Sequence, residues 1–491
     1  MPRDFIKLLA IRYGLMCVVL SGLLVTSSTS SAGERRGMSI LSPRKSPTHA
    51  HVQVVKSKPI DVDRVQSDES GSAEELTEVD RPIVNEERVA SEEESQPADE
   101  KETSEEEEET EEEDPEEEPA GVLQIIPHQV GALTAESTYT GEVYSNTRGG
   151  LNTNGATRYR GNIDLILTGD LEELVGIQGS SFFIYGGDVH GTSLSNRDVG
   201  DWQIISDIDP YPYVNVTQMQ EYWLRQEFLE GKLYFKLGRQ DANADFGFSD
   251  LAGDFINNSF VTIPTIPFPV WPAQSLGVSG FAELTDNVTF GAGVYESNKL
   301  NQLWGDSVAD KQGQIVLSHL EWKTQTGPQQ QLPGTWRAGA WVDSGQWQEI
   351  TTAPISQVFD HNYGFWFSGD QLLFKEEYGT DDEQGLGVFC EIGWAPGDRN
   401  FLDQYYGAGV VYRGLIPGRD DDNCGIGLAD IHFSRQTQAR DGFFYETVVE
   451  VFYKAQVTEN LVIQPDVQFI ANPGGNGDDA LAVGLRFELV L

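Results

Sequence analysis

The sequence predicts an all-β protein: a transmembrane antiparallel β-barrel of about 16 strands, preceded by a disordered acidic segment. From residue 121 onward, apolar residues recur at every second position, which is the period of a β-strand. The opposite face of these strands carries full charges, as a water-filled lumen allows; a β-sandwich tolerates such charges only on its outer faces. After the N-terminal region, no run reaches the ~18 apolar residues of a spanning helix.

The N-terminal residues are typical of a secretory signal over 1–32. Arg3, Lys7 and Arg12 precede an apolar run, and small residues end at Ala32. The chain of 491 residues has 33 Lys and Arg against 78 Asp and Glu, a net charge of -45. A field of that sign repels polyphosphate, so nucleic acid is not an expected partner.

Residues 33–120 are predicted to form a disordered, acidic, low-complexity leader. Residues 61–120 alone hold 28 acidic and 4 basic side chains, and the stretch from Glu105 to Glu118 is almost continuous carboxylate. Such self-repulsion cannot be offset by burial. A solvated spacer is the simpler interpretation of the leader. Contact with a cell-wall polymer and loose binding of divalent cations are the alternatives, and a periplasmic location is expected.

Residues 121–491 are predicted to be the barrel, and several strands can be placed from their alternation. In Arg158–Leu167, apolar positions such as Ile163 and Leu165 alternate with charged and polar ones. Gly231 lies between two such runs and predicts a hairpin. The same alternation identifies strands in the segments Glu221–Phe228, Leu233–Leu237, Val288–Val294, Thr335–Asp343, Thr447–Lys454 and Leu481–Leu491.

Segment lengths near ten residues and aromatic residues at segment ends both favour a membrane barrel over a sandwich. One connection is unusually long, from Arg239 to Ser275, and it is rich in Asn, Phe and Pro. Long connections without regular structure are usually functional or disordered. Its composition indicates order, so we interpret it as a loop folded into the pore; a surface loop with a few packed aromatic residues is the alternative.

Several motifs in this region resemble the carbohydrate-selective porins of the OprB type. They are the segments Glu221–Gln226, Phe235–Asn243, Phe255–Phe260, Gly414–Asp422 and Gln464–Gln468, the last followed by Asn472–Gly475. The resemblance extends from Gly121 to Leu491, with the motifs in family order. It implies an outer-membrane porin of a Gram-negative type of envelope, through which mono- and oligosaccharides diffuse.

A sugar presents hydroxyl groups and two weakly apolar ring faces, so a selective channel needs charged hydrogen-bond partners and aromatic planes. Binding must also be weak enough for release. The inferred lumen faces offer such side chains, and we expect them to line the pore and bind substrate: Arg158, Arg160, Glu221, Trp223, Arg225, Glu227, Arg239 and Asp241. Pairing among lumen charges, or packing in the case of Trp223, is the structural alternative.

Other classes of function compete with this interpretation. An enzyme is not expected, because neither an HExxH nor a Gly-x-Ser-x-Gly motif occurs among the seven His and the Ser residues. No cofactor or metal is expected. A porin for other solutes, or a barrel that anchors the envelope through its leader, remains open. Expected partners are carbohydrates and outer-membrane lipids, with a homotrimer as a further hypothesis. Cys390 and Cys424 could form a disulfide only if they lie close together.

Overall fold

The computed structural model describes residues 128–209, 215–297, 313–378 and 383–491. The expected signal (1–32), the leader (33–120) and the first residues of the expected barrel domain therefore lie outside the described residues. Within the described ranges, no helix is long and apolar enough to cross a membrane.

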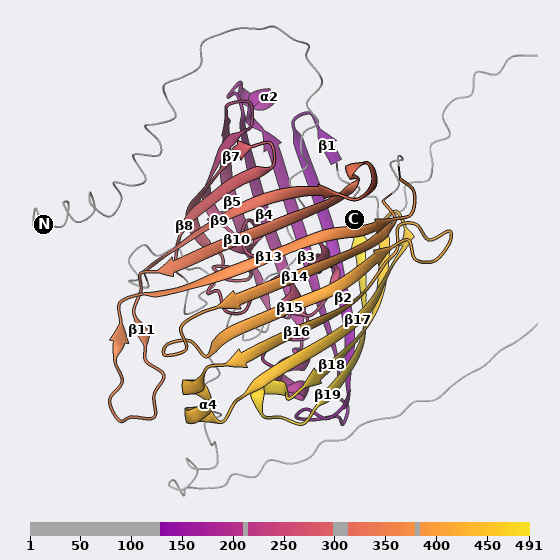
Figure 1. Ribbon diagram of the computed structural model, residues 1–491. Coiled ribbons are helices and arrows are strands. Elements are labelled where there is room, and N and C mark those ends of the chain that lie inside the picture. The colour runs from indigo at the N-terminus through magenta and orange to yellow at the C-terminus, as the bar shows by residue number, and fades with distance from the viewer. Residues whose placement is uncertain (1–127, 210–214, 298–312, 379–382) are drawn as a thin grey trace, which may run out of the picture. The chain divides into compact units, whose positions relative to one another are not determined.

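Sixteen strands within the described residues form one closed antiparallel barrel (Figure 1). They are β2 (Leu133–Arg148), β3 (Thr157–Asp170), β4 (Ser180–Gly191), β5 (Val216–Phe228), β6 (Leu233–Gln240), β7 (Ser275–Thr285), β8 (Val288–Glu296), β9 (Gln314–Thr326), β10 (Leu332–Asp343), β13 (Asn362–Lys375), β14 (Gly385–Trp394), β15 (Leu402–Arg413), β16 (Asn423–Phe433), β17 (Tyr445–Thr458), β18 (Leu461–Ala471) and β19 (Ala480–Val490). Each strand pairs with the next, and β19 closes the ring by pairing with β2. The predicted antiparallel barrel of about 16 strands is confirmed, and the acidic segment predicted before it stays a prediction.

The period-two pattern separates an inner from an outer face as the sequence predicts. On β3, Arg160, Asn162 and Asp164 are buried inside the barrel, whereas Tyr159 and Leu165 are exposed on the outside. The outer face meets lipid and needs apolar side chains, and the inner face can carry charges because it meets water or other polar groups.

The two rims of the barrel differ in the length of their connections. One rim has short turns, such as 229–232, 286–287 and 459–460, together with the helix α2 (Leu171–Val175). The other rim has long connections, which include α4 (Arg435–Asp441) and a small hairpin of β11 (Trp347–Gln348) and β12 (Val358–Phe359). Figure 1 shows α2 at one end of the barrel and α4 and β11 at the other. The short strand β1 (His128–Val130) pairs with the start of β2, so both described ends of the chain lie at the short-turn rim.

Two long connections fold into the barrel and supply much of its packed interior. We name residues 192–209 the first inward segment and residues 241–274 the second inward segment. The second contains α3 (Asn258–Val261), and its side chains Phe255, Phe260 and Trp271 are almost fully buried. The wall accommodates them with glycine: a Cβ at Gly427 would lie 2.6 Å from the Phe255 ring. The apolar core is therefore built largely from connections packed against the inner wall.

Cys390 and Cys424 are not joined by a disulfide. They lie on β14 and β16, which are separated by β15, and both thiols are free. Cys390 lies between the buried Phe389 and Glu391, and Cys424 has the same strand phase as the exposed Ile426 and Leu428, so both cysteines belong to the outer face.

Candidate functional site: the constricted lumen

The second inward segment crosses the lumen, as its composition predicts. It leaves β6 on one side and reaches the wall of β10 and β13. There the Phe248 carbonyl accepts hydrogen bonds from Arg337 Nη1 at 3.2 Å and from Ser368 Oγ at 2.8 Å. The interpretation as a loop folded into the pore is confirmed, and the surface-loop alternative is wrong.

The first inward segment was not predicted from the sequence. Its side chains Leu194 and Ile205 are completely buried. Its backbone is tied to the second segment, because the Asp207 N–H donates to the Ile256 carbonyl at 2.9 Å and the Asn258 N–H donates to the Ile204 carbonyl at 3.2 Å. The two segments therefore form one unit inside the barrel. The missed signal was a short run of isoleucines interleaved with carboxylates, which lacks the prolines that mark the longer segment.

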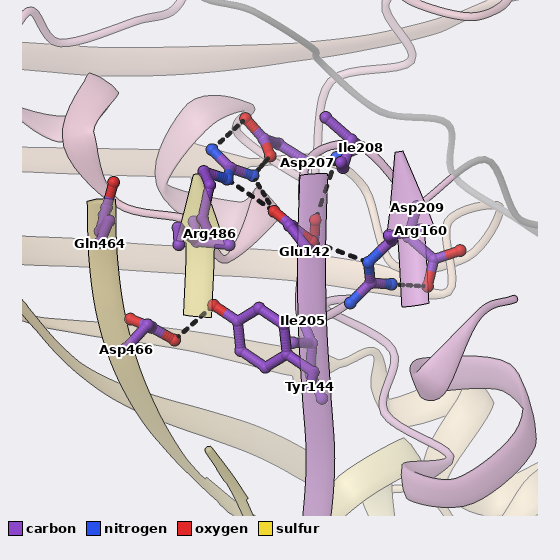
Figure 2. A network of polar contacts seen from close by, with 12 residues as sticks. Glu142, Tyr144, Arg160, Ile205, Asp207, Ile208, Asp209, Gln464, Asp466 and Arg486 are labelled. Atoms are coloured by element: carbon purple, nitrogen blue, oxygen red, sulfur yellow. Dashed lines mark hydrogen bonds and ion pairs between the residues drawn. The ribbon is translucent and has the colours of Figure 1, made fainter. Parts of the chain in front are cut away.

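A row of charges on three adjacent strands holds the first inward segment (Figure 2). Glu142 on β2 is directly opposite Arg160 on β3 and Arg486 on β19. Its carboxylate accepts from Arg160 Nε at 2.8 Å and from Arg486 Nε at 2.6 Å. The segment caps the outer ends of this row: Asp209 Oδ2 lies 2.6 Å from Arg160 Nη1, and Asp207 pairs with Arg486. The shared Glu142 carboxylate thus orients both arginines, and the arginines join the first inward segment to the wall.

Neighbouring polar contacts extend this network. Tyr144 on β2 donates to Asp466 on β18 at 2.8 Å, as Figure 2 shows. Arg158 lies two residues before Arg160 on the same face of β3, and its Nε lies 2.8 Å from Asp198 Oδ2 in the first inward segment. Arg158 and Arg160 are therefore brought to the interior, but both are engaged with the first inward segment.

Other predicted pore residues form the root of the second inward segment. The buried Glu221 carboxylate accepts from the Asp241 N–H at 3.0 Å, and the Asp241 carboxylate accepts from the Trp271 N–H at 3.0 Å. Arg239 is fully buried and donates from Nε to the Gln220 carbonyl at 3.0 Å. Glu221 and Asp241 thus tie the beginning and the end of the segment to β5, while Arg239 joins β6 to β5.

Burial also changes the charge balance of the inward segments. It raises the pKa of Asp207 to about 7, although the Arg486 guanidinium opposes the change. Burial likewise raises the pKa of Asp241 to about 6, against the hydrogen bonds from backbone N–H groups. The desolvation of these carboxylates outweighs the groups that stabilise their charged form.

The remaining predicted residues lie together on β5 and β6, and we name them, with two neighbours, the β5–β6 cluster: Trp223, Arg225, Glu227, Tyr234 and Lys236. Arg225 and Lys236 are directly opposite each other in the register. Each cation has a carboxylate partner, since Arg225 Nη2 lies 2.8 Å from Glu227 and Lys236 Nζ lies 2.5 Å from Asp245.

Aromatic rings support both cations of the β5–β6 cluster. The Arg225 guanidinium lies 3.9 Å from the Tyr234 ring centre, and the Lys236 ammonium lies 4.9 Å from the Trp223 ring centre. Trp223 also stacks on Phe183 at 4.8 Å between ring centres. Because Trp223 already contacts a ring and a cation, it supports charged groups. Arg225 and Glu227 keep side-chain exposures of 28% and 33%.

Comparison with known proteins agrees with this geometry. Residues 154–491 match the family described as "Carbohydrate-selective porin, OprB family". The chain belongs to the OprB family. It is 26% identical over 398 residues to Porin B of Pseudomonas aeruginosa, a match that covers 72% of this chain and 86% of the relative.

A solved structure supports the fold of this OprB-family chain. The structure of Pseudomonas putida OprB at high pH covers 73% of this chain and 94% of its own, with a TM-score of 0.66 and 23% identity. The family and the barrel together make the protein a porin of the outer membrane, a transport channel. Direct contact between sugar and any of the eight predicted lumen residues stays a prediction.

Proposed function

We propose that this porin lets mono- and oligosaccharides cross the outer membrane by facilitated diffusion through its lumen. Membership of the carbohydrate-selective family supports the solute class. The observation that carries the proposal is the β5–β6 cluster, where paired and partly exposed charges face the lumen beside aromatic rings.

The β5–β6 cluster matches the chemistry of sugar hydroxyls. A guanidinium donates several hydrogen bonds in a fixed plane, and a carboxylate accepts them, so Arg225 and Glu227 can together satisfy a vicinal pair of hydroxyls. Their mutual pairing leaves little net charge, which suits a neutral solute and allows fast release. We assign sugar contact to Arg225 and Glu227 and a supporting role to Trp223.

The other predicted residues receive different roles in this proposal. Arg158 and Arg160 hold the first inward segment, Glu221 and Asp241 hold the root of the second, and Arg239 joins β6 to β5. They act on transport through the shape of the constriction.

The decisive experiment is the conductance of the full mature chain in a planar bilayer, titrated with glucose, a maltooligosaccharide series and a neutral non-sugar polymer of equal size. Saturable block by sugars but not by the polymer is the expected result. Equal effects of sugar and polymer would favour a general porin. A folded chain without conductance would favour a barrel that anchors the envelope.

The position of the leader and the oligomeric state belong to the same proposal. Both described chain ends lie at the short-turn rim, which supports a periplasmic leader because outer-membrane barrels have short periplasmic turns. We propose that the leader acts there as an acidic tether and that its binding partner is a cell-wall polymer. A homotrimer is the assembly we expect, and cross-linking in native membranes tests it.

A further inference from the structure

We propose that the inner face of one strand, β17, holds both inward segments at a common junction, in addition to the separate anchors of each segment, and so sets the solute size limit of the pore. Glu446 and Glu450 are the positioning residues. The inference rests on the channel function of the barrel and is independent of which solute the channel prefers.

The two carboxylates make the same kind of contact to different segments. Glu446 accepts from the Trp202 and Gln203 N–H groups, each at 2.7 Å, in the first inward segment. Glu450 accepts from the Ile256 N–H at 2.6 Å and the Asn257 N–H at 2.8 Å, in the second. In each case the two oxygens of one carboxylate bind two consecutive backbone N–H groups. Each carboxyl group thus satisfies two buried backbone donors of one segment, which fixes the segment in both position and orientation.

The spacing of the two residues explains why one strand can hold both segments. Residues four apart on a strand point to the same face. Glu446, Val448, Glu450 and Phe452 are all buried on the inside, and Val451 is exposed on the outside. Two buried carboxylates on one strand are costly unless their oxygens are fully bonded, and the inward segments supply that bonding.

The second segment follows β17 over several further positions. Lys454 Nζ lies 3.0 Å from Asp254, and the Phe452 ring lies 4.8 Å from the Phe255 ring. Asp254, Phe255 and Ile256 thus meet β17 in the reverse order of Lys454, Phe452 and Glu450. These successive contacts set one alignment of the segment against β17, which defines the position of the segment along the barrel axis.

The neighbouring strand reinforces the junction. Gln468 on β18 is paired with Glu450. Its amide donates to the Ile205 carbonyl at 2.9 Å and accepts from Asn257 Nδ2 at 3.1 Å, so one side chain touches both segments. Since the segments also bond to each other, release of one loosens the other.

The test compares Glu446→Gln and Glu450→Gln with wild type in the full mature chain. A carboxamide has one acceptor oxygen, so one N–H of each pair loses its partner, and its NH₂ group faces an N–H donor. A buried N–H group left without its acceptor shifts the ratio of docked to undocked segment by about tenfold. We expect larger and noisier single-channel conductance and entry of larger neutral polyethylene glycols.

The control variant is Glu488→Gln on β19, which removes a 25% exposed lumen carboxylate 3.9 Å from Lys454. It should keep the wild-type polymer cut-off. If Glu450→Gln fails to assemble, Gln468→Met removes both amide contacts without removing a charge and should also raise the cut-off. A wild-type cut-off in both Glu450→Gln and Gln468→Met, in barrels that resist heat in detergent as wild type does, overturns the proposal. Polymer exclusion needs no sugar, so this outcome is separate from a failure of the proposed function.

Discussion

At the scale of single residues, we expect Glu142 to contribute strongly to stability, because its one carboxylate forms ion pairs with both Arg160 and Arg486. Replacement by Gln removes the shared carboxylate, so Arg160 keeps only Asp209 and Arg486 keeps only Asp207 as an ion-pair partner among these residues. Breaking a buried ion pair in this way costs about 3 kcal/mol. We therefore expect Glu142→Gln to lower the midpoint of chemical unfolding in detergent. Glu488→Gln, which changes a 25% exposed carboxylate, should leave the midpoint at the wild-type value. Equal midpoints for both variants would contradict the role of Glu142 as a shared carboxylate.

Arg225 should matter for solute binding more than for stability. Its side chain is 28% exposed and paired with Glu227, so a hydroxyl can reach it. Loss of a hydrogen bond to a charged donor weakens binding by about tenfold. We expect Arg225→Gln to raise the sugar concentration for half-maximal block by that factor. Lys323→Gln removes the same charge from a 53% exposed side chain on β9 and serves as the control. Unchanged block in Arg225→Gln would remove Arg225 from the sugar site.

The sequence could predict which face of the wall these residues occupy, but not what they bind. Alternation along a strand is a local property, and it placed Arg160 and Arg225 correctly on inner faces. One partner of Arg160 is Asp209, which is 49 residues away in the chain. Asp209 lies beside Arg160 because the connection that carries it folds into the barrel. Such non-local pairing separates a structural arginine from an accessible one, and no local pattern contains it.

At the scale of elements, the β5–β6 hairpin depends on Gly238. This residue has φ of +145°, and a Cβ there would lie 2.1 Å from the Tyr222 carbonyl oxygen and 2.7 Å from the Cα of Trp223. Any side chain must push the two strands apart, with a backbone cost of about 1–3 kcal/mol. We expect Gly238→Ala to lower the unfolding midpoint and to weaken sugar block, because Trp223 and Lys236 shift together.

The matched control for this glycine is Gly253 in the second inward segment, where a Cβ would meet no atom within 4 Å. Gly253→Ala should leave both stability and block at wild-type values. Wild-type behaviour of Gly238→Ala would show that the hairpin relaxes without moving the cluster.

Elements differ in how strongly the sequence marks them. The second inward segment was predictable because prolines and aromatic residues interrupt the alternation over a long stretch. The first inward segment is shorter, and its apolar residues Ile204, Ile205 and Ile208 are too few to define a period. Tertiary contacts, such as those with Glu446, Arg160 and Arg486, give it a fixed place.

At the scale of the whole molecule, the preference for a barrel over a sandwich followed from charges on the second face of each strand. That argument holds because the inner face is where Glu142, Arg160 and Arg486 meet. It could not reveal how much of the lumen the connections fill. The filling depends on pairs such as Glu450 with Ile256, which join β17 to a segment 194 residues earlier.

The orientation of the molecule in the membrane gives the last prediction. If the short-turn rim is periplasmic, the long connection that contains β11 and β12 faces the exterior and the leader faces the periplasm. An epitope inserted after Ala353, in the exposed part of that connection, should be labelled by antibody on intact cells. The same epitope inserted after Ser72 of the leader should be labelled only after the outer membrane is permeabilised. Immunoblots of both variants measure the amount of each protein, so that the labelling can be compared at equal protein levels. Labelling of the Ser72 epitope on intact cells would reverse the assignment of the rims and with it the proposed periplasmic tether.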